Sequence, residues 1–166
     1  MPKLAFSILL LLSCCCFART QTATPSEVPT IEFCELVRNA ANYDGKHVRV
    51  RVVYFSAFEI SGFGEPAGRS CHDNSMVWVN FDPSVKSNSK PEIYKRFRDS
   101  IYAQRVVMNG HIASLEGEGL LWETPVVVTG VIHQPNGHGY GHTNIYSHEF
   151  VVSSIEEVGE PKKTKP

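Results

Sequence analysis

The chain has 166 residues, of which 42% are hydrophobic, and its formal net charge is −1 at pH 7. This length and composition suit one small globular domain and leave little room for a second hydrophobic core. A nearly neutral chain also lacks the broad positive field that drives binding to nucleic acids, so we expect no nucleic-acid partner.

The first 18 residues are typical of an export signal. Lys3 supplies a positive charge, an apolar run extends from Leu4 to Phe17, and small residues stand before Arg19, where a signal peptidase would cut. The run is shorter than the ~20 apolar residues that a stable transmembrane helix needs. We therefore predict a signal peptide at residues 1–18 and an exported protein, either secreted or periplasmic.

A second interpretation of this segment is a lipid anchor. The sequence Leu11-Leu12-Ser13-Cys14 resembles the lipobox of bacterial lipoproteins, in which the cysteine is acylated and becomes the new N-terminus. The protein would then be a membrane-anchored lipoprotein, and Cys14 would be its only attachment to the membrane.

Two polar segments flank the part of the chain that is expected to fold. Residues 19–30 are rich in Thr, Pro and Ser and predict a flexible tether. Residues 159–166 are charged and contain Pro, and they predict a disordered tail. Residues 31–158 remain for one domain.

The first element expected in this domain is a short helix. Its apolar residues recur at helical spacing, with Thr30 as the expected N-terminal cap: Phe33, Leu36, Val37 and Ala40. An Asp-Gly turn at residues 44–45 ends the segment.

The clearest strand covers residues 47–55, because apolar and polar side chains alternate along it. One face carries Val48, Val50 and Val52, and the other carries His47, Arg49 and Arg51. We expect this strand to continue to residue 60 over a bulge, and then to enter a loop containing Gly62, Gly64 and Gly68.

The remaining elements alternate between strands and one more helix. Pro91 suits the first turn of that helix, whose apolar residues are Ile93, Phe97 and Ile101. Further strands are expected at residues 75–81, 105–112, 125–133 and 149–158. Two of them contain a glycine, Gly110 and Gly130, which suits strands that bend to close a small barrel. We therefore predict a mainly β fold with two short helices, a five- to six-stranded OB-like barrel.

Several motifs resemble those of small exported bacterial proteins with OB-like barrels. The resemblance starts with a helix that carries Cys34, continues through residues 43–46 (Tyr-Asp-Gly-Lys) and a Val-x-Val strand, and covers most of residues 31–158. Phe58-Glu59, Cys71, the Trp78 strand and residues 139–146 keep the same order. The chain departs from the pattern at Val53, which occupies a position that is usually Gly. The resemblance implies a fold but no set of catalytic residues.

Only Cys34 and Cys71 lie outside the signal segment, and two cysteines in an exported domain usually pair. We predict a disulfide, which would stabilise the fold by about 4 kcal/mol on the chain-entropy model. The alternatives are two free buried thiols, or a metal site that would need two more ligands.

A candidate ligand-binding surface combines cations with aromatic rings. Arg49 and Arg51 on the first strand form a basic stripe, which Lys46 and Arg105 would extend. On OB barrels, aromatic residues interleaved with cations bind single-stranded nucleic acid or oligosaccharide. The alternative is a solvated strand face. The candidate ligand-binding residues are Arg49, Arg51, Phe63, Tyr140 and His142.

Four histidines occur within sixteen residues, at positions 133, 138, 142 and 148. A metal-dependent hydrolase would require some of them to converge, with His138 and His142 as the first candidates. The glycines of this segment exclude the helical spacing that often presents such ligands. A surface loop over the barrel is the simpler interpretation, and we expect neither a metal nor another cofactor.

No familiar catalytic motif is present in the chain. Cys71-His72-Asp73 contains the residue types of a nucleophilic triad, but adjacent side chains rarely converge. We therefore expect no catalytic residues and a monomeric, non-catalytic binding or structural module. Its ligand, whose identity the sequence does not specify, would lie between residues 62–68 and 137–142.

Overall fold

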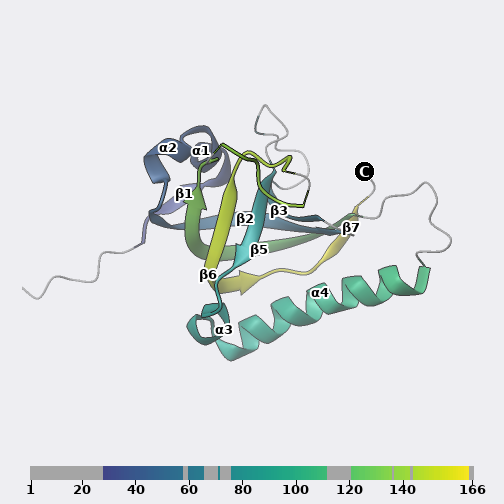
Figure 1. Cartoon of the computed structure of the whole chain (residues 1–166). Helices are drawn as coiled ribbons and strands as arrows, with labels where there is room; N and C mark the ends of the chain where they lie inside the picture. The colour runs from purple at the N-terminus through teal and green to yellow at the C-terminus, as the bar shows by residue number, and fades with distance from the viewer. Residues whose placement is uncertain are drawn as a thin grey trace, which may run out of the picture.

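The computed structural model describes residues 28–57, 60–65, 71, 76–111, 121–135, 137–142 and 144–164 (Figure 1). The predicted signal peptide, Cys14 and most of the predicted tether lie outside these residues. Within the described segments, no helix is both long enough and apolar enough to cross a membrane.

Five strands form a closed barrel: β2 (His47–Ala57), β3 (Ile60–Gly64), β4 (Val77–Phe81), β5 (Leu121–His133) and β6 (Glu149–Val158). Their spatial order is β2-β3-β4-β6-β5, and β5 pairs with β2 to complete the circle. All pairs are antiparallel except β4 and β6. The predicted OB-like barrel is therefore confirmed.

Two short strands extend the sheet where the sequence predicted irregular chain. β1 (Thr30–Glu32) runs parallel to β2, and β7 (Lys162–Thr164) pairs with β5. Thr30 therefore belongs to a strand and does not cap the first helix, which Glu32 precedes. The predictions of a tether at this residue and of a disordered tail through residues 162–164 were wrong, because backbone pairing with β2 and β5 orders these ends.

The barrel interior is filled from alternate positions of its strands. Val48, Val50 and Val52 are almost completely buried, whereas Arg51 on the other face is exposed. Val50 lies opposite Val128 in the register of β2 and β5. Burying side chains of this size contributes about 1.5–3 kcal/mol each, so this face provides much of the driving force for closure.

Helices lie on opposite sides of the barrel (Figure 1). On one side, the predicted single helix is divided at Asn39 into α1 (Phe33–Arg38) and α2 (Ala40–Tyr43). The predicted apolar side chains face the barrel, with Phe33, Leu36 and Ala40 buried and Val37 half-buried. On the other side, α3 (Val85–Asn88) leads into α4 (Pro91–His111). Phe97 of α4 is buried against aromatic rings of the barrel, with ring-centroid distances of 5.4 Å to Tyr54 and 5.5 Å to Phe81.

Two of the predicted elements were wrong. Residues 105–111 continue α4 instead of forming a strand, because a short apolar run does not by itself distinguish a helix from a strand. Gly62 and Gly64 lie in β3, not in a loop, because the chain reverses after Ala57 and pairs back on β2.

Candidate ligand-binding face

The structure separates the predicted ligand-binding residues into three places. Phe63 is 1% exposed and packs in the core against Tyr54 and Phe150, so its prediction as a ligand contact was wrong. Phe63 faces inward because β3 pairs with β2 and β4, and this pairing cannot be read from the local sequence. Arg49 and Arg51 lie on the outer face of β2.

Both arginines form ion pairs with the end of β6. Arg49 Nε lies 2.7 Å from Glu156 Oε2, and Arg51 Nη2 lies 3.1 Å from Glu157 Oε2. Burial alone would raise the pKa of Glu156, but hydrogen bonds from Thr129 and Arg49, together with the guanidinium charge, lower it. The carboxylates thus neutralise much of the predicted basic stripe. Arg105, its proposed extension, lies on α4 and not on a barrel strand.

The loop between β5 and β6 forms a small hairpin around Tyr140 and Tyr146. The backbone amide of Tyr140 donates to the Tyr146 carbonyl at 2.9 Å, and the reverse bond measures 3.4 Å. The Tyr140 hydroxyl donates to the carbonyl of Gln134 at 2.6 Å. These bonds close the hairpin and tie it to Gln134, the first residue after β5.

The hairpin places two aromatic side chains against the outer face of β4. The half-buried Trp78 ring lies 5.3 Å from the ring of Tyr146 and 5.6 Å from that of His142, measured between centroids. A Cβ atom at Gly141 would lie 2.9 Å from Trp78 Cε3, so only glycine permits this approach. Gly141 also has a positive φ of 79°, which glycine adopts without strain.

Polar groups continue this surface across β4 and β6. The Asn80 amide donates to a carboxylate oxygen of Glu149, and Glu149 lies opposite Trp78 in the parallel register of the two strands. We call this surface the Trp78 face and define it by Trp78, Asn80, His142, Tyr146 and Glu149. Of these five residues, only His142 was predicted from the sequence as a ligand contact. The alternation of β4, with Trp78 and Asn80 on the same side, was the signal for two more members.

Among the residues that define the Trp78 face, His142 is the only one whose side chain can carry a positive charge. The described segments that build the face, at residues 60–65, 76–81, 134–135, 137–142 and 144–158, contain no Lys or Arg. The Arg49 and Arg51 pairs lie at the opposite end of β6, seven or more residues from Glu149, which corresponds to about 20 Å along a strand. The predicted cations and the loop residues therefore do not form one site.

The histidines of the loop contact different partners. His133 Nδ1 lies 3.9 Å from Asp44, and His148 Nδ1 lies 2.8 Å from Ser147 Oγ. Burial lowers the pKa of His148. Among the described residues, the only close group of three potential metal ligands is Cys34, Glu65 and Cys71. The geometry therefore gives no support to a metal centre at His138 and His142.

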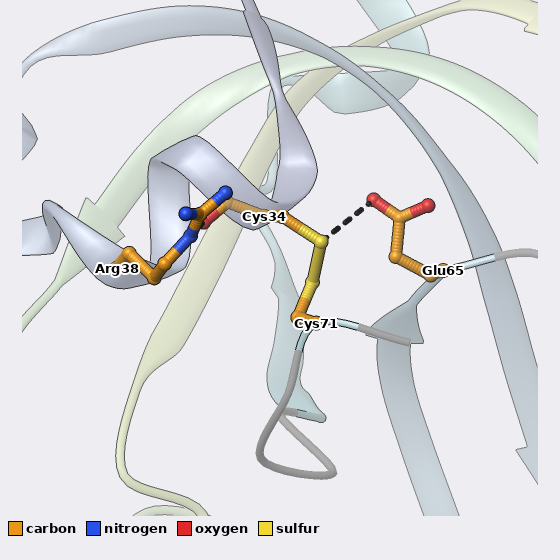
Figure 2. The surroundings of a disulfide bond; sticks show 4 residues. All are labelled: Cys34, Arg38, Glu65 and Cys71. Carbon is orange, nitrogen blue, oxygen red and sulfur yellow. Dashed lines mark hydrogen bonds between the residues drawn. A yellow bond between two sulfur atoms is a disulfide. The ribbon is translucent and has the colours of Figure 1, made fainter. Parts of the chain in front are cut away.

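The predicted disulfide between Cys34 and Cys71 is present, with an S–S distance of 2.01 Å (Figure 2). It joins α1 to the chain after β3, so the alternatives of free thiols and of a metal site were wrong. Glu65 Oε1 lies 3.4 Å from Cys34 Sγ. A thiol could donate a proton to this carboxylate, but the bonded sulfur has none, so in the disulfide the two atoms are only in contact.

Fold and surface together define an OB-like barrel with an aromatic outer face, and the described segments that build this face contain no Lys or Arg. Comparisons with protein-family models, with curated proteins and with solved structures find no match to this chain.

Proposed function

We propose that this protein is an exported, non-catalytic binding module that holds its ligand on the Trp78 face. OB barrels commonly bind ligands across their second and third strands and the loop between the fourth and fifth. Here those elements are β3, β4 and the loop between β5 and β6. The observation that carries the proposal is the hairpin that brings Tyr146 and His142 onto Trp78.

The arrangement of polar groups favours binding over catalysis. His142 lies edge-on to Trp78, and Glu149 accepts a hydrogen bond from Asn80. No hydrogen bond among the described residues links His142 to Glu149 as a base to its orienting partner. Export, and a relationship to the small exported bacterial proteins that the chain resembles, are parts of the same proposal.

Nucleic-acid binding is the weaker hypothesis for this surface. Arg49 and Arg51 are paired with carboxylates of β6, and phosphate binding would have to compete with those pairs. The Trp78 face itself offers a carboxylate, which repels phosphate.

The proposal is tested by NMR with a panel of probes. Backbone amide shifts of the purified exported protein would be followed with neutral glucose and N-acetylglucosamine hexasaccharides, a twelve-residue oligothymidylate and an apolar decapeptide. We expect at least one probe to shift amides of residues 76–81 and 140–149, and the Trp78→Ala variant to lose that response.

The matched control is Trp122→Phe. Trp122 lies on β5, and its indole Nε1 is buried without a hydrogen-bond partner, so the change removes no hydrogen bond. Binding should survive in this variant. If every probe leaves residues 76–81 and 140–149 unshifted, the binding function is wrong.

A further inference from the structure

We infer that the Trp78 face binds a neutral oligosaccharide. This inference deepens the proposed function and rests on it. Three properties of the face indicate the chemical class of the ligand: its charge, its half-buried tryptophan and the hydrogen-bonded pair of Asn80 and Glu149.

The charge of the face excludes the common anionic ligands. The described segments that build it contain no Lys or Arg, and Glu149 contributes a carboxylate. A phosphate, sulfate or uronate group would meet repulsion here without a compensating cation. A ligand without charge avoids this penalty.

The Trp78 ring is held in place before any ligand arrives. Tyr146 is buried beneath the hairpin and contacts one part of the indole, and Gly141 approaches its six-membered ring. The indole nevertheless stays partly exposed. A fixed, half-exposed aromatic surface buries apolar area at little entropic cost, and the C–H face of a pyranose ring is a flat partner for it.

Asn80 and Glu149 supply the polar contacts that a sugar needs. Their mutual hydrogen bond occupies one Asn80 N–H and one Glu149 oxygen. The Asn80 carbonyl oxygen and the second Glu149 oxygen have no hydrogen-bond partner among the described residues. Hydroxyl groups both donate and accept, so neighbouring hydroxyls of a sugar can pair with the carboxylate and the amide together.

An apolar protein partner is the main competing occupant. Ile145, next to Tyr146 in the hairpin, is 74% exposed and would be its natural anchor. An apolar partner would offer no hydrogen bonds to Asn80 and Glu149. A sugar can pack on the aromatic ring and also pair its hydroxyls with these two side chains, so the face favours the sugar. The variant Ile145→Ser separates the two occupants.

The experiment is calorimetric titration of the purified exported protein with the two neutral hexasaccharides and with hexagalacturonate as the anionic counterpart. We expect a neutral hexasaccharide to bind and hexagalacturonate not to bind. Trp78→Ala and Asn80→Ala should each weaken binding by about tenfold, the effect of one lost contact of this kind. Trp122→Phe and Ile145→Ser should leave affinity unchanged.

Asn80 is exposed on the barrel surface, so its variant keeps the test valid if Trp78→Ala does not fold. The inference is overturned if neither neutral sugar binds, if hexagalacturonate binds equally well, or if Asn80→Ala binds as the wild type does. A peptide that binds the face through Ile145, in place of sugar, would overturn the ligand class but leave the binding function intact. If no probe in the NMR panel shifts the amides of residues 76–81 and 140–149, both the ligand class and the binding function are wrong.

Discussion

Glycines in the strands of this barrel are positions where another residue approaches the backbone. At Gly130, a Cβ atom would lie 2.3 Å from the carbonyl oxygen of Val151 and 2.4 Å from Phe150 Cε1. The register of β5 and β6 shifts beside this residue, between Thr129 and Gly130. Because Gly130 has no side chain, the strands can form the bulge and the Phe150 ring can pack against the backbone at this position.

We expect Gly130→Ala to destabilise the protein by about 1–3 kcal/mol, the usual cost of overpacking. Chemical denaturation measures this loss. Gly159→Ala is the matched control, because its nearest neighbours are side-chain carbons of Pro125 at 3.1–3.4 Å. A Gly130→Ala variant as stable as Gly159→Ala would contradict the steric argument.

His148 should make stability depend on pH. Burial lowers its pKa below the ordinary value of 6.5, so the unfolded chain binds a proton more readily than the folded protein does. Stability should therefore fall as the pH drops from 6.5 through the lowered pKa of His148. Denaturation of the wild type and His148→Gln at pH values on both sides of this window tests the prediction. Equal losses of stability in the two proteins would show that another group is responsible.

At the scale of elements, the leading helices depend on a covalent link. The disulfide closes a sequence separation of 37 residues and ties α1 to the chain that follows β3. Phe33 and Leu36 bury the inner side of α1, while Arg38 donates to the Cys34 carbonyl at 3.1 Å (Figure 2). The bond thus restricts the unfolded chain and also holds the helix on the barrel.

Replacing both Cys34 and Cys71 by Ser should reduce stability by about 4 kcal/mol, from the chain-entropy estimate for this loop. Hydrogen exchange should accelerate most in α1 and α2, whereas the amides of β2 and β5 should keep their order of protection. Reduced wild-type protein is the control and should match the double variant. Uniform acceleration throughout the chain would contradict a local role in holding α1.

At the scale of the whole molecule, the barrel closes through residues that are far apart in sequence. His47 pairs with Val131 and Ser56 pairs with Trp122, so the pairing of β2 with β5 joins residues 66 to 84 positions apart. Ion pairs between β2 and β6, such as Arg49 with Glu156, also join distant segments. Each exposed pair contributes only about 0.2–1 kcal/mol, so closure depends mainly on the buried strand faces.

This topology predicts slow folding. Domains dominated by non-local strand pairing fold in about milliseconds to seconds, because loop-closure entropy must be overcome before the contacts form. Stopped-flow tryptophan fluorescence with the disulfide intact should show refolding on that timescale. Completion within tens of microseconds would contradict a folding rate limited by the non-local pairing of β2 with β5.

The sequence by itself determined the elements whose pattern is local. Alternating valines of β2 predicted a half-buried strand, the spacing of Phe33, Leu36 and Ala40 predicted a helix, and the cysteine count predicted the disulfide. Each signal lies within one segment or follows from composition, so no partner needs to be known.

Only the tertiary structure decided which segments meet. Phe63 is buried in the core, Arg49 pairs with Glu156, and Trp78 packs against Tyr146. These contacts form because strand pairing and loop packing bring distant residues together. Residues 105–111 were ambiguous for the same reason: local apolar content suits a strand or a helix, and continuation of α4 settled the choice. Periodicity records which side of an element is buried, but the neighbours of that element depend on the packing of the whole chain.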